Sequence, residues 1–205
     1  LPDYPNIAEI KRSAKEKATP FGGTWHSDWS FMKKPPSATL LHSKIIPPVG
    51  GNTLFANTEK AFAALPDEMK DKLRNLKVIH SAKIPYADDG FYALEKEERS
   101  MKILPSKEAK ATFSHPMIKI HPETKKECLF INPVYTINIE GFSEDESQQL
   151  LWELYEHMIQ DQFIYEHVWN ENMSIMWNNR TLMQQATAGY DGYDKLLHRI
   201  TLAAL

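Results

Sequence analysis

The sequence predicts a mainly β protein, a sandwich or jelly roll with a few flanking helices. Three observations favour this class: many short segments rich in β-branched, aromatic and aliphatic residues, turn residues between those segments, and only one long helical pattern. With 205 residues, the chain is long enough to bury a sizeable core. We therefore expect residues 1–205 to form one domain.

The predicted strands follow one another with clear breaks between them. They cover residues 25–31, 38–46, 53–56, 77–81, 117–120, 128–131, 163–169, 173–177 and 196–202. Prolines cannot donate to a β ladder and paired glycines permit tight turns, so the stretch 47–51, Pro-Pro-Val-Gly-Gly, ends the second strand. Residues 117–120 and 128–131 flank a turn-rich connection and are predicted to form a hairpin.

One long helix is predicted after Ser143. Ser143 and Glu146 form a capping box, and apolar residues recur on one stripe from Leu150 to Met158. A shorter helical pattern begins near Thr58, the predicted N-cap, and Pro66 fits the first turn of a second short helix.

Two segments have no regular pattern. Residues 1–20 are polar, rich in lysine and interrupted by prolines, which predicts an irregular arm. Residues 82–110 are charged, with Tyr86, Phe91 and Tyr92 embedded among the charges. This excursion is either a mobile lid or a solvated loop, and the pattern leaves both open.

The composition and charge of the chain favour one class of binding partner. The formal net charge is −3 with acidic and basic residues interleaved, which favours a small-molecule ligand over nucleic acid or a membrane surface, and leaves a homo-oligomer open. Cys128 is alone in an apolar run, so we interpret it as a buried thiol in a reducing compartment, the cytoplasm. The chain opens at Leu1 without a methionine, and we expect further residues before it.

The segment Thr24-Trp25-His26-Ser27-Asp28-Trp29 is the strongest candidate for chemistry. In an extended chain, side chains two apart point to the same face, so His26 and Asp28 would present an imidazole and a carboxylate together. With a second histidine from a distant strand, such a pair forms the facial triad of non-haem Fe(II) oxygenases. A surface histidine beside a solvated aspartate is the alternative. The aromatic neighbours and the preceding Gly22-Gly23 favour a site.

Six segments in order resemble the landmark motifs of the taurine dioxygenase and 2,4-dichlorophenoxyacetate dioxygenase family. They are residues 21–28, 47–57, 115–124, 129–132, 177–180 and 198–199. The resemblance implies a double-stranded β-helix, a jelly roll of the cupin type, with Fe(II) as metal and 2-oxoglutarate as cosubstrate. It also implies hydroxylation of a small, often anionic substrate, and further family residues before the His-x-Asp segment.

The resemblance assigns roles to individual residues. His26 and Asp28 match two iron ligands, Thr53 matches a threonine that helps to hold 2-oxoglutarate, and Arg199 matches an arginine that meets an anionic group of cofactor or substrate. Gly22 lies where a substrate-binding asparagine is expected, and Trp25 is a candidate wall of the substrate pocket.

The sequence departs from the family pattern at two further positions that matter for metal and cosubstrate binding. The distal iron-binding histidine falls on Gln184, and the arginine that clasps the distal carboxylate of 2-oxoglutarate falls on Lys195. An amide oxygen is a poorer donor to Fe(II) than imidazole, and lysine keeps the charge of arginine but loses its planar fork.

The sequence therefore leaves three functions open. The first is an Fe(II)- and 2-oxoglutarate-dependent dioxygenase that hydroxylates a small, possibly anionic organic substrate and releases succinate and CO2. The second is a pseudoenzyme that binds a carboxylate ligand or a protein partner in the same pocket. The third is a metal-independent lyase or isomerase, since scaffolds of this type host unrelated chemistries.

Overall fold

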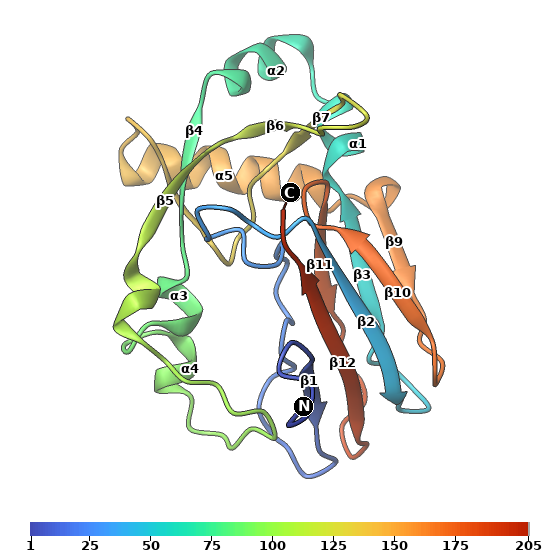
Figure 1. The fold of residues 1–205 in the computed structure, drawn as a ribbon. Helices are drawn as coiled ribbons and strands as arrows, with labels where there is room; N and C mark the ends of the chain where they lie inside the picture. Colours follow the sequence, from blue (N-terminus) through green and yellow to red (C-terminus); the bar gives the residue numbers. More distant parts are fainter. Residues whose placement is uncertain (205) are drawn as a thin grey trace.

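Two antiparallel sheets face each other in the computed structural model, which describes residues 1–204 and confirms the predicted jelly roll (Figure 1). The strand order is β1-β12-β2-β10 in the first sheet and β11-β3-β9 in the second. The bounds in the first sheet are β1 (Ala8–Arg12), β12 (Lys195–Leu202), β2 (Ala38–Ile45) and β10 (Ser174–Asn178). Those in the second are β11 (Leu182–Ala186), β3 (Thr53–Asn57) and β9 (Ile164–His167).

A third sheet and a hairpin extend this framework. The third sheet has the order β5-β4-β8, and β6 pairs with β7 in the predicted hairpin. The bounds are β4 (Lys77–Ser81), β5 (Thr112–Pro116), β8 (Thr136–Ile139), β6 (Ile118–Ile120) and β7 (Glu127–Leu129).

The helices flank the sheets. They are α1 (Thr58–Ala63), α2 (Asp67–Arg74), α3 (Lys83–Tyr86), α4 (Phe91–Leu94) and α5 (Glu144–Met158), with short 3-10 turns at Lys107–Lys110 and Asp161–Phe163. The capping box of α5 is confirmed, because Ser143 and Glu146 exchange side-chain to backbone hydrogen bonds. The predicted N-cap of α1 is wrong by one residue: Asn57 accepts from the Lys60 N–H, and Thr58 is already helical.

Two hydrophobic cores divide the interior. The larger one lies between α1, α5 and the third sheet, around residues such as Leu151, Leu154 and Ile139. The smaller one lies between the two facing sheets and consists of Leu41, Phe55, Trp169, Trp177 and Leu197. Three members of the smaller core also line the cavity described below, so this core forms part of the floor of the site.

The predicted strand at 25–31 is wrong. Only His26 pairs, in an isolated antiparallel bridge with Gln184, and the chain then turns through hydrogen bonds from Ser30 to Ser27 and from Met32 to Trp29. Trp29 has φ +48°, in the left-handed region. Aromatic residues gave this turn the composition of a strand.

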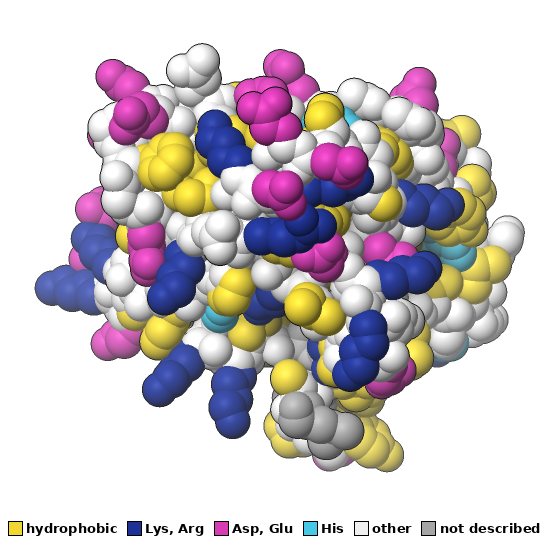
Figure 2. All heavy atoms as spheres, turned by 90° about the horizontal axis from the view of Figure 1, so that it is seen from above, with side chains coloured by type: hydrophobic (Ala, Val, Ile, Leu, Met, Phe, Trp, Pro, Cys, Tyr) yellow, Lys and Arg dark blue, Asp and Glu magenta, His cyan; other side chains and the backbone are white. Residues whose placement is uncertain are grey.

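The predicted irregular arm at 1–20 contains β1, which pairs with the edge of β12 in the register Ile10 to Leu197. Strands β5, β8 and β11 were also missed. The excursion at 82–110 contains the short helices α3 and α4 and the 3-10 turn at Lys107–Lys110, which the sequence pattern did not predict. No helix within the described part of the chain is long and apolar enough to cross a membrane. Acidic and basic side chains are interspersed on the face in Figure 2, in keeping with the small net charge.

Buried histidines hold the turn that follows Asp28. His80 is fully buried, with Nδ1 3.0 Å from the Ser30 hydroxyl and Nε2 3.2 Å from the Thr136 hydroxyl. His115 lies with Nε2 3.0 Å from the Met32 carbonyl oxygen. Burial, followed by the charges of His115 and Lys119, lowers the pKa of His80 to about 3.

This burial predicts loss of stability in acid. The pKa of His80 in the unfolded chain is about 6.5. Below this pH, His80 binds a proton in the unfolded chain but not in the folded one, so the free energy of unfolding falls by up to about 1.4 kcal/mol per pH unit. Urea midpoints measured between about pH 7.5 and about pH 5 should show this slope. His80→Gln should reduce it, whereas the control His42→Gln, at a half-buried position, should keep it. An unchanged slope in His80→Gln would contradict the assignment.

Candidate functional site

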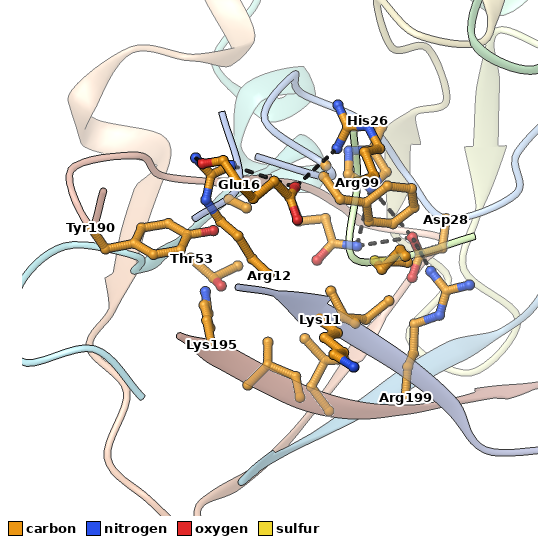
Figure 3. Close-up of a pocket in the computed structure, with 18 of the residues that line it drawn as sticks. Lys11, Arg12, Glu16, His26, Asp28, Thr53, Arg99, Tyr190, Lys195 and Arg199 are labelled. Carbon is orange, nitrogen blue, oxygen red and sulfur yellow. Dashed lines mark hydrogen bonds and ion pairs between the residues drawn. The ribbon is translucent and has the colours of Figure 1, made fainter. Parts of the chain in front are cut away.

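The site begins at the backbone bridge between His26 and Gln184. The His26 N–H donates to the Gln184 carbonyl at 3.0 Å, and the Gln184 N–H donates to the His26 carbonyl at 2.7 Å. Residues that exchange both hydrogen bonds lie directly opposite each other, so their side chains are neighbours. The turn after His26 then brings Asp28 back to the same place (Figure 3).

Three side chains converge there. The Gln184 amide nitrogen Nε2 donates to Asp28 Oδ1 at 2.9 Å and lies 3.4 Å from His26 Nε2, which is itself 3.4 Å from Asp28 Oδ1. All three residues are buried. The structure therefore brings together the three residues that the sequence analysis selected, although through a turn rather than a strand.

The tautomer of His26 follows from its hydrogen bond. Nδ1 lies 2.7 Å from the Thr24 carbonyl oxygen, which can only accept. Nδ1 therefore carries a proton, and Nε2 is the ring nitrogen that faces Asp28 and Gln184. A backbone carbonyl in this role is typical of metal-ligating histidines.

Asp28 is a buried carboxylate held in its ionised form. Burial raises its pKa, but the hydrogen bond and charge of His26, the charge of Arg199 and the Thr39 hydrogen bond together bring the pKa below its usual value. The Thr39 hydroxyl donates to Oδ2 at 2.6 Å, and Arg199 Nη1 lies 4.0 Å from Oδ1. The site thus keeps one negative charge close to His26 Nε2.

The geometry of these atoms fits a metal with one amide ligand. Bonds of about 2.1 Å at right angles place neighbouring donor atoms about 3 Å apart, close to the separations found here. A half-turn of the Gln184 amide exchanges Nε2 for the oxygen Oε1, which would then face the same point. Among residues 1–204, no three His, Cys, Asp or Glu side chains form a possible metal site, so the amide is needed to complete the set.

The residues expected to hold 2-oxoglutarate lie around one cavity of about 60 Å³ next to this triad. Lys195 is 6 % exposed and donates to the Gly51 carbonyl oxygen at 2.6 Å, and its burial lowers its pKa to about 8. The Thr53 hydroxyl accepts from Trp169 Nε1 at 3.0 Å. Arg199 reaches Asp28 and lies 5.2 Å from the centre of the Trp29 ring. Figure 3 shows Lys195 pointing toward Thr53 and Arg199 pointing toward Asp28.

The arm supplies a part of this cavity that the sequence pattern did not indicate. Arg12 and Glu16 line it together with Arg99 from the excursion. The guanidinium of Arg12 donates to Asp191 at 3.0 Å and to the Glu16 carbonyl, and Arg99 lies 3.9 Å from the Glu16 carboxylate. The short alternation in β1 was the only local signal of this pairing.

Gly22 lies beside the site, whereas the Trp25 side chain points away from it. Gly22 has φ +74°, and a Cβ there would be 3.2 Å from His26 Cε1, so its lack of a side chain lets the loop approach the imidazole. The expectation that Trp25 lines the substrate pocket is wrong. Its side chain packs against the larger core, because neighbours along the extended residues at 25–26 point in opposite directions.

A second cavity of about 660 Å³ adjoins the first. Phe21, Gly22, His26 and Ala186 line both cavities. Tyr86, Phe91 and Tyr92 of the excursion line the second cavity, so the excursion forms part of a cavity wall.

Comparison with known proteins gives a consistent result. Residues 2–201 match the family described as "Taurine catabolism dioxygenase TauD, TfdA family". An alkylsulfatase from Acinetobacter baylyi is 32 % identical over 181 residues, which are 88 % of this chain and 56 % of that protein. The alpha-ketoglutarate-dependent 2,4-dichlorophenoxyacetate dioxygenase of Cupriavidus pinatubonensis is 30 % identical over 190 residues, covering 90 % and 63 %.

A solved structure shares the fold. AAD-2 in complex with Mn(II) and N-oxalylglycine superposes with a TM-score of 0.74 at 27 % identity, covering 89 % of this chain and 69 % of that one. The chain spans less than two thirds of the length of the two curated relatives described above.

Gln184→Glu tests the convergence of the three side chains. Without metal, the variant replaces an N–H donor by a carboxyl group beside Asp28, so we expect a loss of about 1–3 kcal/mol in the free energy of unfolding. Mn(II) should then raise the melting temperature more than it does in the native chain, because a second carboxylate binds it. Gln185→Glu, at the neighbouring half-buried position, is the control. Identical melting curves for the two variants would contradict the geometry.

Proposed function

The chain belongs to the TauD, TfdA family, and on this premise we propose that it is an Fe(II)- and 2-oxoglutarate-dependent dioxygenase that hydroxylates a small organic substrate. In this reaction 2-oxoglutarate is converted to succinate and CO2. The observation that carries the proposal is the convergence of His26 Nε2, Asp28 Oδ1 and the Gln184 amide within 3.4 Å of one another. The names of relatives such as the 2,4-dichlorophenoxyacetate dioxygenase support the same reaction class.

Each protein residue has a distinct task in this proposal. Bound Fe(II) would supply the redox chemistry that activates dioxygen. His26 offers the Nε2 lone pair, Asp28 a charged oxygen and Gln184 its amide oxygen, which leaves other coordination positions for cosubstrate and dioxygen. Thr39 donates to Oδ2 of the Asp28 carboxylate, and Arg199 lies 4.0 Å from Oδ1. His26 and Asp28 are thus positioned before anything binds, whereas the Gln184 amide must turn to present its oxygen.

Lys195 and Thr53 are suited to hold an anion in the same cavity. Lys195 is a buried cation whose hydrogen bond goes to a neutral carbonyl, and burial alone accounts for its pKa shift, with no carboxylate beside it among the described residues. A buried unpaired charge is costly, so a carboxylate of 2-oxoglutarate would stabilise it. The ammonium would hold this carboxylate less rigidly than the fork of an arginine.

The pseudoenzyme stays the second candidate because of one observation. The Gln184 amide already satisfies Asp28 Oδ1 and faces His26 Nε2 without any metal. Metal binding must break these contacts and turn the amide. A chain that kept only the Lys195 pocket would bind a carboxylate ligand and perform no oxidation.

Metal binding separates the two candidates. The native chain, titrated anaerobically with Fe(II), should bind one ion, and in air should convert 2-oxoglutarate to succinate. Gln184→His should bind the ion about 10–100-fold more tightly, because an imidazole replaces an amide. Gln185→His is the matched control and should leave the affinity unchanged. If neither the native chain nor Gln184→His binds Fe(II), the dioxygenase proposal is wrong.

The pKa of Lys195 predicts how carboxylate binding depends on pH. Lys195 is protonated below about pH 8, so affinity for 2-oxoglutarate should be highest there and fall by up to about tenfold per pH unit above it. Lys195→Arg should remove this fall, since arginine stays charged. Lys11→Arg, which alters another lysine lining the cavity, should not change it. Calorimetric titration across this range gives the slopes, and a flat native profile would contradict the role of Lys195.

A further inference from the structure

The second cavity has the position and size of a ligand chamber. We call it the aromatic chamber and define it by Phe21, Tyr86, Phe91, Tyr92, Val134 and Tyr135. Its volume of about 660 Å³ lies within the range of about 300–1,000 Å³ typical of small-molecule sites. It meets the first cavity at His26, so a molecule in it would touch this member of the triad, and neither Lys195 nor Thr53 lines the chamber.

The two cavities differ in charge. Seven charged residues line the first: Lys11, Arg12, Glu16, Asp28, Arg99, Lys195 and Arg199. Within the described residues, no lysine, arginine, aspartate or glutamate lines the aromatic chamber. A charged group moved there from water would lose hydration without gaining an ionic partner, which is costly. The charge of the first cavity therefore suits the anionic cosubstrate, and the chamber favours a neutral group.

The chamber wall is a packed set of rings. Tyr92 contacts Phe21, Tyr86 and Phe91, with ring centres 6.1, 5.3 and 5.2 Å apart. The guanidinium of Arg99 lies 4.9 Å from the centre of the Tyr92 ring, and Glu95 binds that guanidinium. Aromatic faces in such an arrangement offer a preformed surface to another flat group.

The remaining lining adds polarity without charge. Tyr135 packs edge-on to His26, with ring centres 6.4 Å apart, and its phenol stays neutral at physiological pH because burial raises its pKa well above 10. Gly22 contributes no side chain beside the imidazole. The chamber can therefore offer a neutral hydroxyl group to a substrate, but no counter-ion.

Building on the proposed function, we infer that the aromatic chamber holds the body of the substrate and selects an uncharged, flat apolar group over a charged one. The charged cavity and the uncharged chamber thus separate cosubstrate from substrate on the two sides of His26.

A matched pair of probes tests this selection. 2-Naphthalenemethanol and 2-naphthoate share a ring system and differ in charge. Titrated into the chain loaded with Mn(II) and N-oxalylglycine, the alcohol should bind at least about tenfold more tightly than the carboxylate. The same titrations without metal and N-oxalylglycine measure the chamber by itself, where the order of affinities should be the same.

Two variants locate the binding. Val134→Asp places a carboxylate in the chamber and should weaken the alcohol by about tenfold or more, while Mn(II) and N-oxalylglycine bind as before. Val168→Asp, at a position 61 % exposed and outside both cavities, is the control and should have no effect. Phe91→Ala removes part of the wall at a position 50 % exposed, where folding is not at risk, and should also weaken the alcohol.

The outcomes separate this inference from the proposed function. Equal or tighter binding of 2-naphthoate, or an alcohol affinity that neither Val134→Asp nor Phe91→Ala changes, would overturn the chamber inference even if metal binds. If Mn(II) and N-oxalylglycine do not bind, the proposed function fails, and the metal-free titrations still decide whether the chamber prefers the neutral probe.

Discussion

The site depends on one backbone contact, the antiparallel bridge between His26 and Gln184. These residues are far apart in sequence, and their paired hydrogen bonds fix the side chains as neighbours. The turn held by the buried His80 and Ser30 then returns Asp28 to the pair. Without the bridge, nothing would hold the His26 imidazole beside the Gln184 amide, and the cavity behind them would lose one wall.

The buried charges around this bridge differ in whether an opposite charge lies nearby. Asp28 is a buried anion with Arg199 nearby, whereas Lys195 is a buried cation that has only a carbonyl oxygen as its hydrogen-bond partner. The first arrangement is complete by itself, and the second would be completed by an anion. On the other side of His26, the aromatic chamber has no charged lining within residues 1–204. The charged lining of the first cavity therefore favours an anionic ligand, whereas the uncharged lining of the aromatic chamber favours a neutral one.

Local sequence patterns predicted elements whose signals are local. The Ser143 capping box and the apolar strand around Leu40 and Leu41 were found because propensity and burial agree there. Strand β11 was missed because Gln184 and Gln185 turn polar side chains toward the site and its rim, which breaks the apolar alternation. His26 and Gln184 are far apart in the sequence, so the spacing of residues alone does not predict their pairing. The family resemblance supplied that correspondence.

The most direct measurement is an anomalous difference map from crystals of the chain grown with Mn(II) and 2-oxoglutarate. The account predicts one strong peak within about 2.0–2.3 Å of His26 Nε2, an Asp28 carboxylate oxygen and Gln184 Oε1, with the amide turned from its metal-free orientation. A map with no peak there, and with Gln184 Nε2 still donating to Asp28, would contradict it.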